Sequence, residues 1–269
     1  MPVGTKGAMK AMLSSDLEEN GNQIILSNTY HIANIPGSKK IHEFGGLHKF
    51  MNWKRNLLTD SGGFQMVSLN ELMEINEDGE EFKYHLDGSI IKLPPEESIN
   101  IQNNIGADII MQLDDVVHVK TVGPRVKEAC ERTVRWLDRC LKSNKNTDQQ
   151  ALFPIVQGGV DPKLREYCLE ELIKRNTYGY AIGGLVGGEN KDDFSRTVIQ
   201  CAKALPENKP IYLMGAGYPE DIIVAACFGV DMMDCVFPTR TARFGTALTR
   251  KGPLKLKKIE FRKDFSPID

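Results

Sequence analysis

Short runs of apolar residues recur along the chain, and each is followed by small or polar residues and then by a longer amphipathic stretch. Such uninterrupted runs are typical of strands that are buried on both faces, as in parallel sheets. The predicted strands are residues 24–26, 57–59, 108–113, 152–156, 180–182, 211–214 and 232–236. The opening residues 1–5 have the character of the end of one further strand.

The stretches between these runs have helical character, and several begin with proline in or near the first turn, where its missing N–H leaves no hydrogen bond unmade. They cover residues 124–142, 162–175, 191–204 and 219–228. About eight alternations of strand and helix, in a chain of this length, predict an α/β fold, a (β/α)8 TIM barrel. A doubly wound sheet is the alternative. Its only support is the Gly-Ala-Gly at residues 215–217, which lacks the third glycine of a dinucleotide-binding turn.

Both ends of the predicted barrel look incomplete. The chain begins inside a strand-like segment, and no closing helix follows the eighth predicted strand. A length of 269 residues suits one large domain. We therefore expect a single barrel domain over residues 1–269, truncated at both ends.

The composition is that of a globular protein, with 41% hydrophobic and 26% charged residues. No apolar run approaches the length of a membrane span, and no signal peptide opens the sequence. The six cysteines are irregularly spaced without a CxxC pair, which favours reduced thiols in the cytoplasm over disulfides or a metal site. His42 and His48 flank a Gly-Gly turn, and we interpret them as surface or packing residues.

Positive charge is concentrated near the carboxyl end. Residues 239–263 contain nine Lys or Arg and one acid, Glu260, although the formal net charge of the chain is −2. The rest of the chain is therefore acidic overall. A basic segment on an acidic body is typical of a surface that contacts a polyanion, and a solvated lysine-rich hairpin is the alternative.

The carboxyl ends of the predicted strands carry the candidate chemistry, because a barrel places its reactive groups there. Three of these ends have an aspartate, Asp60, Asp114 or Asp234, and a fourth has Gln157. One carboxylate can attack an anomeric carbon while a second, if protonated, donates to the leaving group. An aspartate and a glutamine can also read the hydrogen-bonding edge of a planar heterocycle. These residues favour glycosidic bond chemistry on a base-bearing sugar.

The same residues also have structural interpretations. Asp60 before Ser-Gly-Gly could shape a turn, and Asp114 and Asp115 could cap the segment that follows them. Gln157 could equally be a structural residue. An aspartate inside an apolar run is costly unless it is paired, so Asp234 is the strongest functional candidate. The role of Asp115 stays open.

The chain resembles the tRNA-guanine transglycosylases, in particular the eukaryotic members, over essentially its whole length. The matching motifs are Asn-Thr-Tyr-His at 28–31, Asp-Ser-Gly-Gly-Phe-Gln at 60–65, Ile-Val-Gln-Gly-Gly at 155–159, Gly-Gly-Leu-Val-Gly-Gly-Glu at 183–189, Met-Gly-Ala-Gly-Tyr at 214–218 and Asp-Cys-Val-Phe-Pro-Thr-Arg at 234–240. They occur in the family's order, so their joint signal is specific.

The resemblance implies that guanine at the wobble position of a tRNA anticodon is exchanged for queuine through a covalent aspartyl-ribosyl intermediate. Asp234 would be the nucleophile at C1′, and Asp60 the general acid and base. The residues expected to bind the base are Asp60, Ser61, Gly62, Gly63, Phe64, Asp114, Gln157, Gly183, Gly184, Leu185, Gly187 and Met214. The residues expected to bind RNA are Gly215, Ala216, Gly217, Tyr218, Pro219, Glu220, Asp221, Thr239, Arg240, Thr241, Ala242 and Arg243.

The residues at two positions indicate which base the site accepts. Gly187 stands where bacterial members, which take a smaller precursor, usually carry valine, and Val116 stands where they usually carry cysteine. The absence of a branched side chain at Gly187 leaves room for the cyclopentenediol of queuine. The resemblance therefore favours queuine over the precursor.

The family's structural zinc is expected in a full-length member, but its CxCxxC motif and later histidine are absent from residues 1–269. No metal ligand is therefore assigned in this chain, and no organic cofactor is expected. At position 94 the family usually has serine, and Pro94 removes that helix N-cap.

The resemblance also implies partners and a location. These are the tRNA anticodon loop, guanine and queuine, and either an accessory subunit or a second copy of the chain. The expected location is the cytoplasm, or the mitochondrial outer membrane as a peripheral protein. Two alternatives to the active enzyme are a non-catalytic tRNA-binding accessory subunit and an unrelated barrel glycosidase. The presence of both Asp60 and Asp234 argues against the accessory subunit.

Overall fold

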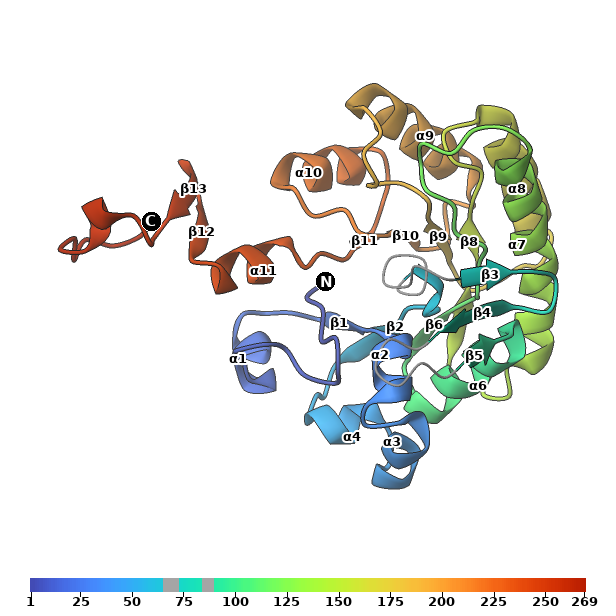
Figure 1. The fold of residues 1–269 in the computed structure, drawn as a ribbon, viewed down its shortest axis with the longest axis horizontal. Helices are drawn as coiled ribbons and strands as arrows, with labels where there is room; N and C mark the ends of the chain where they lie inside the picture. Colours follow the sequence, from blue (N-terminus) through green and yellow to red (C-terminus); the bar gives the residue numbers. More distant parts are fainter. Residues whose placement is uncertain (65–72, 84–89) are drawn as a thin grey trace.

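The computed structural model describes residues 1–64, 73–83 and 90–269. Short parallel strands lie at its centre, and helices cover their outer side (Figure 1). Two four-stranded parallel sheets have the orders β1-β2-β6-β7 and β11-β10-β9-β8. Their strands are β1 (Ile24–Ser27), β2 (Asn56–Thr59), β6 (Ile109–Met111), β7 (Ala151–Phe153), β8 (Ile155–Val156), β9 (Tyr180–Ile182), β10 (Ile211–Leu213) and β11 (Met232–Met233).

Each of the seven predicted runs contains a strand of these sheets, so the predicted α/β class with parallel strands is confirmed. The run at residues 152–156 is divided into β7 and β8 at Pro154, because proline has no N–H to donate to a ladder. Gln112 N–H bonds the carbonyl of Phe153 at 3.1 Å, and Ala181 N–H bonds that of Pro154 at 2.8 Å. The two sheets therefore meet along one continuous piece of chain.

The amino-terminal residues pair with strands of both sheets. Val3 forms a parallel bridge with Leu26 of β1, flanked by a bond of 2.7 Å from Gly4 N–H to the Leu26 carbonyl. On the other side, Cys235 N–H donates to the carbonyl of Met1 at 3.3 Å. The prediction that residues 1–5 have strand character is confirmed at Val3.

The four predicted helices are present as α7 (Pro124–Ser143), α8 (Pro162–Ile173), α9 (Lys191–Ala204) and α10 (Pro219–Cys227). Three of them begin with proline, as expected, because the first turn leaves N–H groups without partners in any case. Asp161 caps α8 by accepting from the N–H groups of Lys163 and Leu164. The same role at α9 belongs to Asn190.

Several elements were not predicted from the apolar runs, although the resemblance implies a helix N-cap at position 94. They are α1 (Ser14–Glu19), α2 (Thr29–Asn34), α3 (Ser38–Phe44), α4 (Leu47–Met51), α6 (Pro95–Ile105) and an antiparallel sheet of β3 (Met73–Ile75), β4 (Glu80–Lys83) and β5 (Ile90–Leu93). That sheet is inserted between β2 and β6. Pro94 is the N-cap of α6 and provides no side-chain cap, as its replacement of serine implies.

The basic segment forms α11 (Phe237–Arg243), an antiparallel hairpin of β12 (Thr246–Thr249) and β13 (Gly252–Lys255), and the short η1 (Ile259–Phe261). It extends away from the sheets, at the left of Figure 1. Its lysines and arginines are mostly exposed. The hairpin geometry therefore agrees with both interpretations of this segment, because an exposed cationic hairpin can be solvated or can meet a polyanion.

Two apolar clusters make up the core. The larger one lies between the strands and the helices, and the smaller one takes side chains from the amino-terminal segment and from β1, β2 and β6 to β10. In the part of the chain that the structure describes, no helix has the length and apolarity of a membrane span. All six cysteines are free thiols.

His48 has a more specific role than the predicted surface or packing one. Its Nε2 lies 3.0 Å from Asp108 Oδ2, at the amino-terminal end of β6, and Leu57 N–H donates to the same oxygen at 2.7 Å. The hydrogen bond to Asp108 raises the pKa of His48 above 6.5, although partial burial opposes this. Burial disfavours the charge of Asp108, but its bonds to His48 and Leu57 outweigh that effect and lower its pKa.

This pair predicts a pH-dependent stability. A raised histidine pKa stabilises the fold below about pH 6.5, and that contribution is lost as pH rises through the folded pKa. We expect His48→Gln to lower Tm near pH 5.5, by roughly 2 °C because the pair is half exposed, and to change it less near pH 8.5. Thermal unfolding at both pH values measures this, with exposed His42→Gln as the control. A deficit that is independent of pH would contradict the ion pair.

Candidate functional site

Asp60 follows β2 and is held by the start of α2. Asn28 Nδ2 donates to its Oδ2 at 2.5 Å, and Thr29 N–H donates to its Oδ1 at 2.8 Å. Only 6% of Asp60 is exposed. The motif at residues 28–31 thus supplies the groups that orient this carboxylate at the carboxyl end of its strand.

Asp234 follows β11 and keeps one oxygen unengaged. Its Oδ1 accepts from Tyr212 Oη at 2.5 Å and from Gly215 N–H at 2.8 Å. No described residue donates a hydrogen bond to its Oδ2. The aspartate is half-buried, and its two donors explain how a carboxylate is tolerated beside two methionines. One oxygen is fixed and the other is available for chemistry.

Tyr212 lies in β10 and donates a hydrogen bond to Asp234. The tyrosine is fully enclosed, and burial, followed by the charges of Asp234 and then Asp60, raises its pKa well above the ordinary value. Both carboxylates therefore act on the same phenol, at the carboxyl ends of β2 and β11. Sequence reasoning missed Tyr212, although a tyrosine within a buried strand signals a hydroxyl that needs a partner.

Asp114 and Gln157 form a second polar group on the neighbouring strand ends. Gln157 Nε2 donates to Asp114 Oδ2 at 2.6 Å, and Ser61 Oγ lies 3.3 Å from the other carboxylate oxygen. Burial raises the pKa of Asp114 to about 6, helped by the charge of Asp115, whereas the bonds from Gln157 and Ser61 oppose the rise. Gln157 Oε1 is buried without a partner. A carboxylate and a carbonyl oxygen thus form an acceptor-rich pair.

Glycines allow the backbone to approach this pair. A Cβ on Gly184, which has φ +68°, would lie 2.4 Å from Gln157 Oε1, and one on Gly183 would lie 2.6 Å from Ile155 Cγ2. A Cβ on Gly63 would meet Glu80 Oε1 at 3.1 Å. The glycines predicted at these strand ends are therefore required by close packing.

Asp115, whose role was open, is a structural residue. Arg125 binds its two oxygens at 2.5 and 2.9 Å, and the buried Arg132 also donates to it.

Glu80 of β4 is a second buried acid close to Asp114 and Asp115. It is buried, neither of its oxygens has a partner, and burial followed by the charges of Asp114 and Asp115 raises its pKa well above the ordinary value. Glu80 therefore favours its protonated form.

The remaining residues predicted to bind the base lie around these groups. Ser61, Gly62 and Gly63 are buried beside Asp60, whereas Phe64 is 60% exposed. Leu185 and Met214 are half-buried, and Gly187 is exposed. A Cβ on Gly187 would lie 3.1 Å from Val119 Cγ1, so a side chain there would compete with Val119 for space. Gln65, the last residue of its motif, lies outside the described residues.

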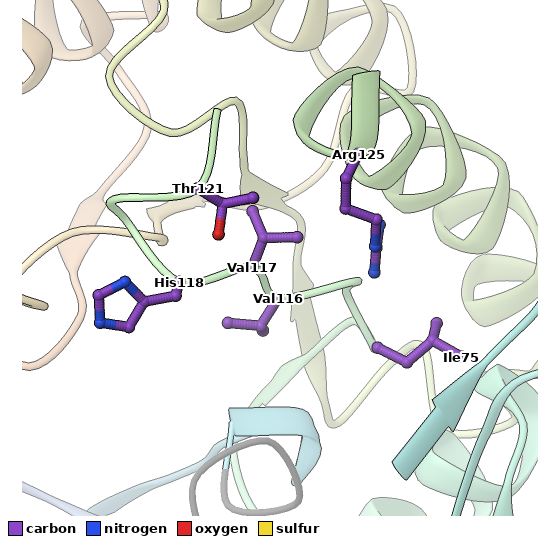
Figure 2. A pocket seen from close by; sticks show the side chains of 6 residues that line it. All are labelled: Ile75, Val116, Val117, His118, Thr121 and Arg125. Carbon is purple, nitrogen blue, oxygen red and sulfur yellow. The ribbon is translucent and has the colours of Figure 1, made fainter. Parts of the chain in front are cut away.

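A pocket of about 320 Å³ lies next to this region. It is lined by Ile75, Val116, Val117, His118, Thr121 and Arg125 (Figure 2). Val116, one of the two positions that bear on the base, belongs to it, and Arg125 connects it to Asp115. None of Asp60, Asp114 and Asp234 lines it.

The segments predicted to bind RNA lie side by side. Tyr218 packs on Phe237 with ring centroids 4.6 Å apart, which joins the segment 215–221 to α11 and its residues 239–243. Ala216 and Gly217 are buried, so any contact with RNA there would be limited. Lys191 Nζ binds both oxygens of Asp221, at 2.6 and 2.7 Å, and lies 5.7 Å from the centre of the Tyr218 ring.

The described residues offer no metal site. Over residues 1–64, 73–83 and 90–269, no group of three His, Cys, Asp or Glu side chains could hold a metal ion. The residues present therefore do not fit the zinc that the resemblance implies, and no chemical step depends on it.

The fold and the site together define an α/β protein with the polar groups of a glycosyl-transfer enzyme. A family model described as queuine tRNA-ribosyltransferase matches residues 1–269. The chain is 53% identical over 269 residues to a protein of Schizosaccharomyces pombe named queuine tRNA-ribosyltransferase catalytic subunit, covering 100% of this chain and 67% of that protein. It is 48% identical over 269 residues to a Thermus thermophilus protein named queuine tRNA-ribosyltransferase, covering 100% of this chain and 70% of that protein.

A Caenorhabditis elegans protein, also named queuine tRNA-ribosyltransferase catalytic subunit, is 53% identical over 270 residues, covering 100% of this chain and 67% of that protein. The chain belongs to the queuine tRNA-ribosyltransferase family. The resemblance that the motifs carried is therefore confirmed.

Proposed function

We propose that this protein exchanges guanine at the wobble position of tRNA for queuine, with Asp234 as nucleophile and Asp60 as general acid and base. The observation that carries the proposal is the position of the two carboxylates. Asp60 follows β2 and Asp234 follows β11, both at the carboxyl ends of parallel strands, and Asp234 Oδ2 accepts no hydrogen bond from a described residue. The names of the family and of its relatives support the same reaction.

The fold proposed for this site is a closed (β/α)8 barrel in one domain over residues 1–269. The bonds of the amino-terminal segment to Leu26 and Cys235 support closure, as does the cluster of side chains that β1, β2 and β6 to β10 share. In such a barrel, the carboxyl ends of all strands face one opening. The truncation at both ends stays a prediction.

The first half of the proposed reaction forms a bond between Asp234 Oδ2 and C1′ of the ribose. The bond from C1′ to N9 of guanine breaks, and the departing base takes a proton from Asp60. Tyr212 and Gly215 hold Oδ1 during this step and leave the second oxygen free to attack. In the second half, Asp60 removes a proton from the incoming base, whose nitrogen then attacks C1′ and releases Asp234.

The base is proposed to be read by Asp114, Gln157 and Gly184. The Watson–Crick edge of a guanine-like base offers two N–H donors and one carbonyl acceptor. The carboxylate of Asp114 matches the donors, and the N–H of Gly184 matches the acceptor. Base contacts from the other predicted residues are proposed on the same grounds. The absence of a side chain at Gly187, where a Cβ would already lie 3.1 Å from Val119 Cγ1, supports queuine over its smaller precursor.

The proposed RNA surface is formed by residues 215–221 and 239–243 together with the basic hairpin. Exposed cations attract phosphates without reading their sequence. Three further proposals rest on the family alone. They are pairing with an accessory subunit or a second copy, structural zinc in a full-length member, and a location in the cytoplasm or on the mitochondrial outer membrane.

The proposal is tested by incubating the protein with radiolabelled guanine and a tRNA that carries guanosine at the wobble position. Label should enter the tRNA, and unlabelled queuine should then displace it. A barrel glycosidase would instead release sugar from oligosaccharides and leave the tRNA unlabelled. An accessory subunit would bind the tRNA without incorporating label.

A further inference from the structure

Arg165 of α8 is enclosed beneath the strand ends that carry Gln157 and Gly184. Its three donor groups bond three backbone carbonyls, those of Gly159, Val156 and Gly183, at 2.8, 2.7 and 2.8 Å respectively. Its exposed fraction is 0%. One side chain of an outer helix thus bonds backbone carbonyls at the ends of β8 and β9.

Burying the Arg165 guanidinium in this way has a cost in solvation free energy. Among the residues that the structure describes, no carboxylate lies within ion-pair distance of Arg165. A buried guanidinium without a counter-ion loses solvation that neutral carbonyls restore only in part. An apolar side chain in the same space would leave these carbonyls without the donors of Arg165, so the arginine both satisfies them and fixes their direction.

The effect of fixing the Gly183 carbonyl follows from the geometry of the peptide bond. The peptide between Gly183 and Gly184 is trans, so its C=O and N–H point in opposite directions. Arg165 draws the Gly183 carbonyl toward the helix layer, which turns the Gly184 N–H away from that layer. No described residue accepts a hydrogen bond from this N–H.

The peptide between Gly183 and Gly184 needs a fixed partner to keep one orientation. Gly184 has φ +68°, and glycine has wide conformational freedom, so the peptide could rotate without a fixed partner. The positive charge behind the carbonyl also polarises the peptide and strengthens its N–H as a donor. Gln157 Oε1, which has no hydrogen-bond partner among the described residues, also lies close to Gly184, 2.4 Å from where a Cβ would be, and Arg165 Nη2 lies 3.4 Å from the same point.

We propose that Arg165 is a positioning residue for the base, which fixes the 183–184 peptide so that the Gly184 N–H faces the carbonyl oxygen of the bound purine. This role rests on the proposed function, because the purine is the ligand that the function supplies. Arg165 does not touch the base itself, and it acts through Gly183 and Gly184.

The test uses Arg165→Met, which preserves length and removes the donors and the charge. The KM for guanine should rise roughly tenfold to hundredfold, as when a positioned hydrogen bond to a buried acceptor is lost. The KM for tRNA should stay within about twofold, because Arg165 donates to the backbone carbonyls of Gly159, Val156 and Gly183, none of which belongs to the proposed RNA surface. Equilibrium dialysis with guanine alone should show the same loss of affinity.

Gln150→Met is the matched control. Gln150 is also buried, and its Nε2 binds the backbone carbonyls of Gln102 and Ala107 at 3.1 and 2.7 Å, away from the proposed site. It should lower Tm and leave the KM for guanine unchanged. If Arg165→Met does not fold, Arg165→Lys takes its place. It keeps the charge without the planar fork and should raise the KM for guanine several-fold.

The outcomes separate the two proposals. If the wild-type protein exchanges guanine and the KM for guanine is unchanged in Arg165→Met, the role of Arg165 is rejected and the proposed function stands. The same criterion applies to Arg165→Lys when that variant takes the place of Arg165→Met. Equal increases in the KM for guanine and for tRNA also reject that role, since they indicate a general structural defect. A wild-type protein that neither incorporates nor binds guanine rejects both proposals.

Discussion

Replacing Asp234 with asparagine is expected to abolish the covalent adduct with tRNA and to lower guanine exchange at least about 10⁴-fold. The physical reason is that an amide oxygen is a poor nucleophile, whereas the carboxylate Oδ2 is free of hydrogen bonds from the described residues. The asparagine keeps the size of the side chain, and its amide oxygen can still accept from Tyr212 and Gly215. The loss should therefore be chemical rather than structural.

The adduct is measured by trapping labelled tRNA on the protein under denaturing conditions. Asp231→Asn is the control, because Asp231 lies just before the same strand and bonds Ile211 N–H at 2.8 Å at the opposite end of β10. This variant should form the adduct at the wild-type rate. An adduct that persists in Asp234→Asn would falsify the assignment of the nucleophile.

The second large effect is a loss of base binding in acid. Burial raises the pKa of Asp114 to about 6, so its carboxylate becomes protonated as pH falls through that value. A protonated carboxyl cannot accept both N–H donors of guanine at once. The KM for guanine should therefore be constant above about pH 7 and should rise about tenfold for each pH unit below 6.

Asp114→Asn tests whether this carboxylate is the group that titrates. An asparagine does not ionise in this range, so the KM for guanine should be high and nearly independent of pH from 5 to 8. Direct guanine binding at each pH separates this effect from any change in the rate of the chemical step. An acid rise of KM that survives in Asp114→Asn would assign the titration to another residue.

The parallel strands and outer helices could be predicted because each is marked by local sequence. Buried strands read as apolar runs, and helices α7, α8 and α10 begin with proline. The antiparallel sheet β3-β4-β5 could not be predicted, because strands such as β4 consist largely of charged residues. Its strands are defined by pairing rather than by composition.

The candidate site likewise contains residues that the sequence marks and one that it does not. Asp60, Asp114 and Asp234 could be found because polar residues that end apolar runs are conspicuous, and the structure brings them to one end of the sheets. Arg165 gave no signal, because an arginine in an amphipathic helix normally faces solvent. Only the three-dimensional packing reveals that it reaches backbone carbonyls of two strands.

The consecutive acids Asp114 and Asp115 have different roles, because their side chains lie on opposite sides of one segment. Asp114 has no basic partner among the described residues and faces Ser61 and Gln157, whereas Asp115 is neutralised by Arg125 and Arg132. Losing Asp115 alone would leave Arg132, whose side chain is 7% exposed, with only the more exposed Glu128 and Glu77 as acidic partners. Through evolutionary time, position 115 is thus expected to covary with its arginines, while the proposed function ties position 114 to the hydrogen-bonding edge of the nucleobase.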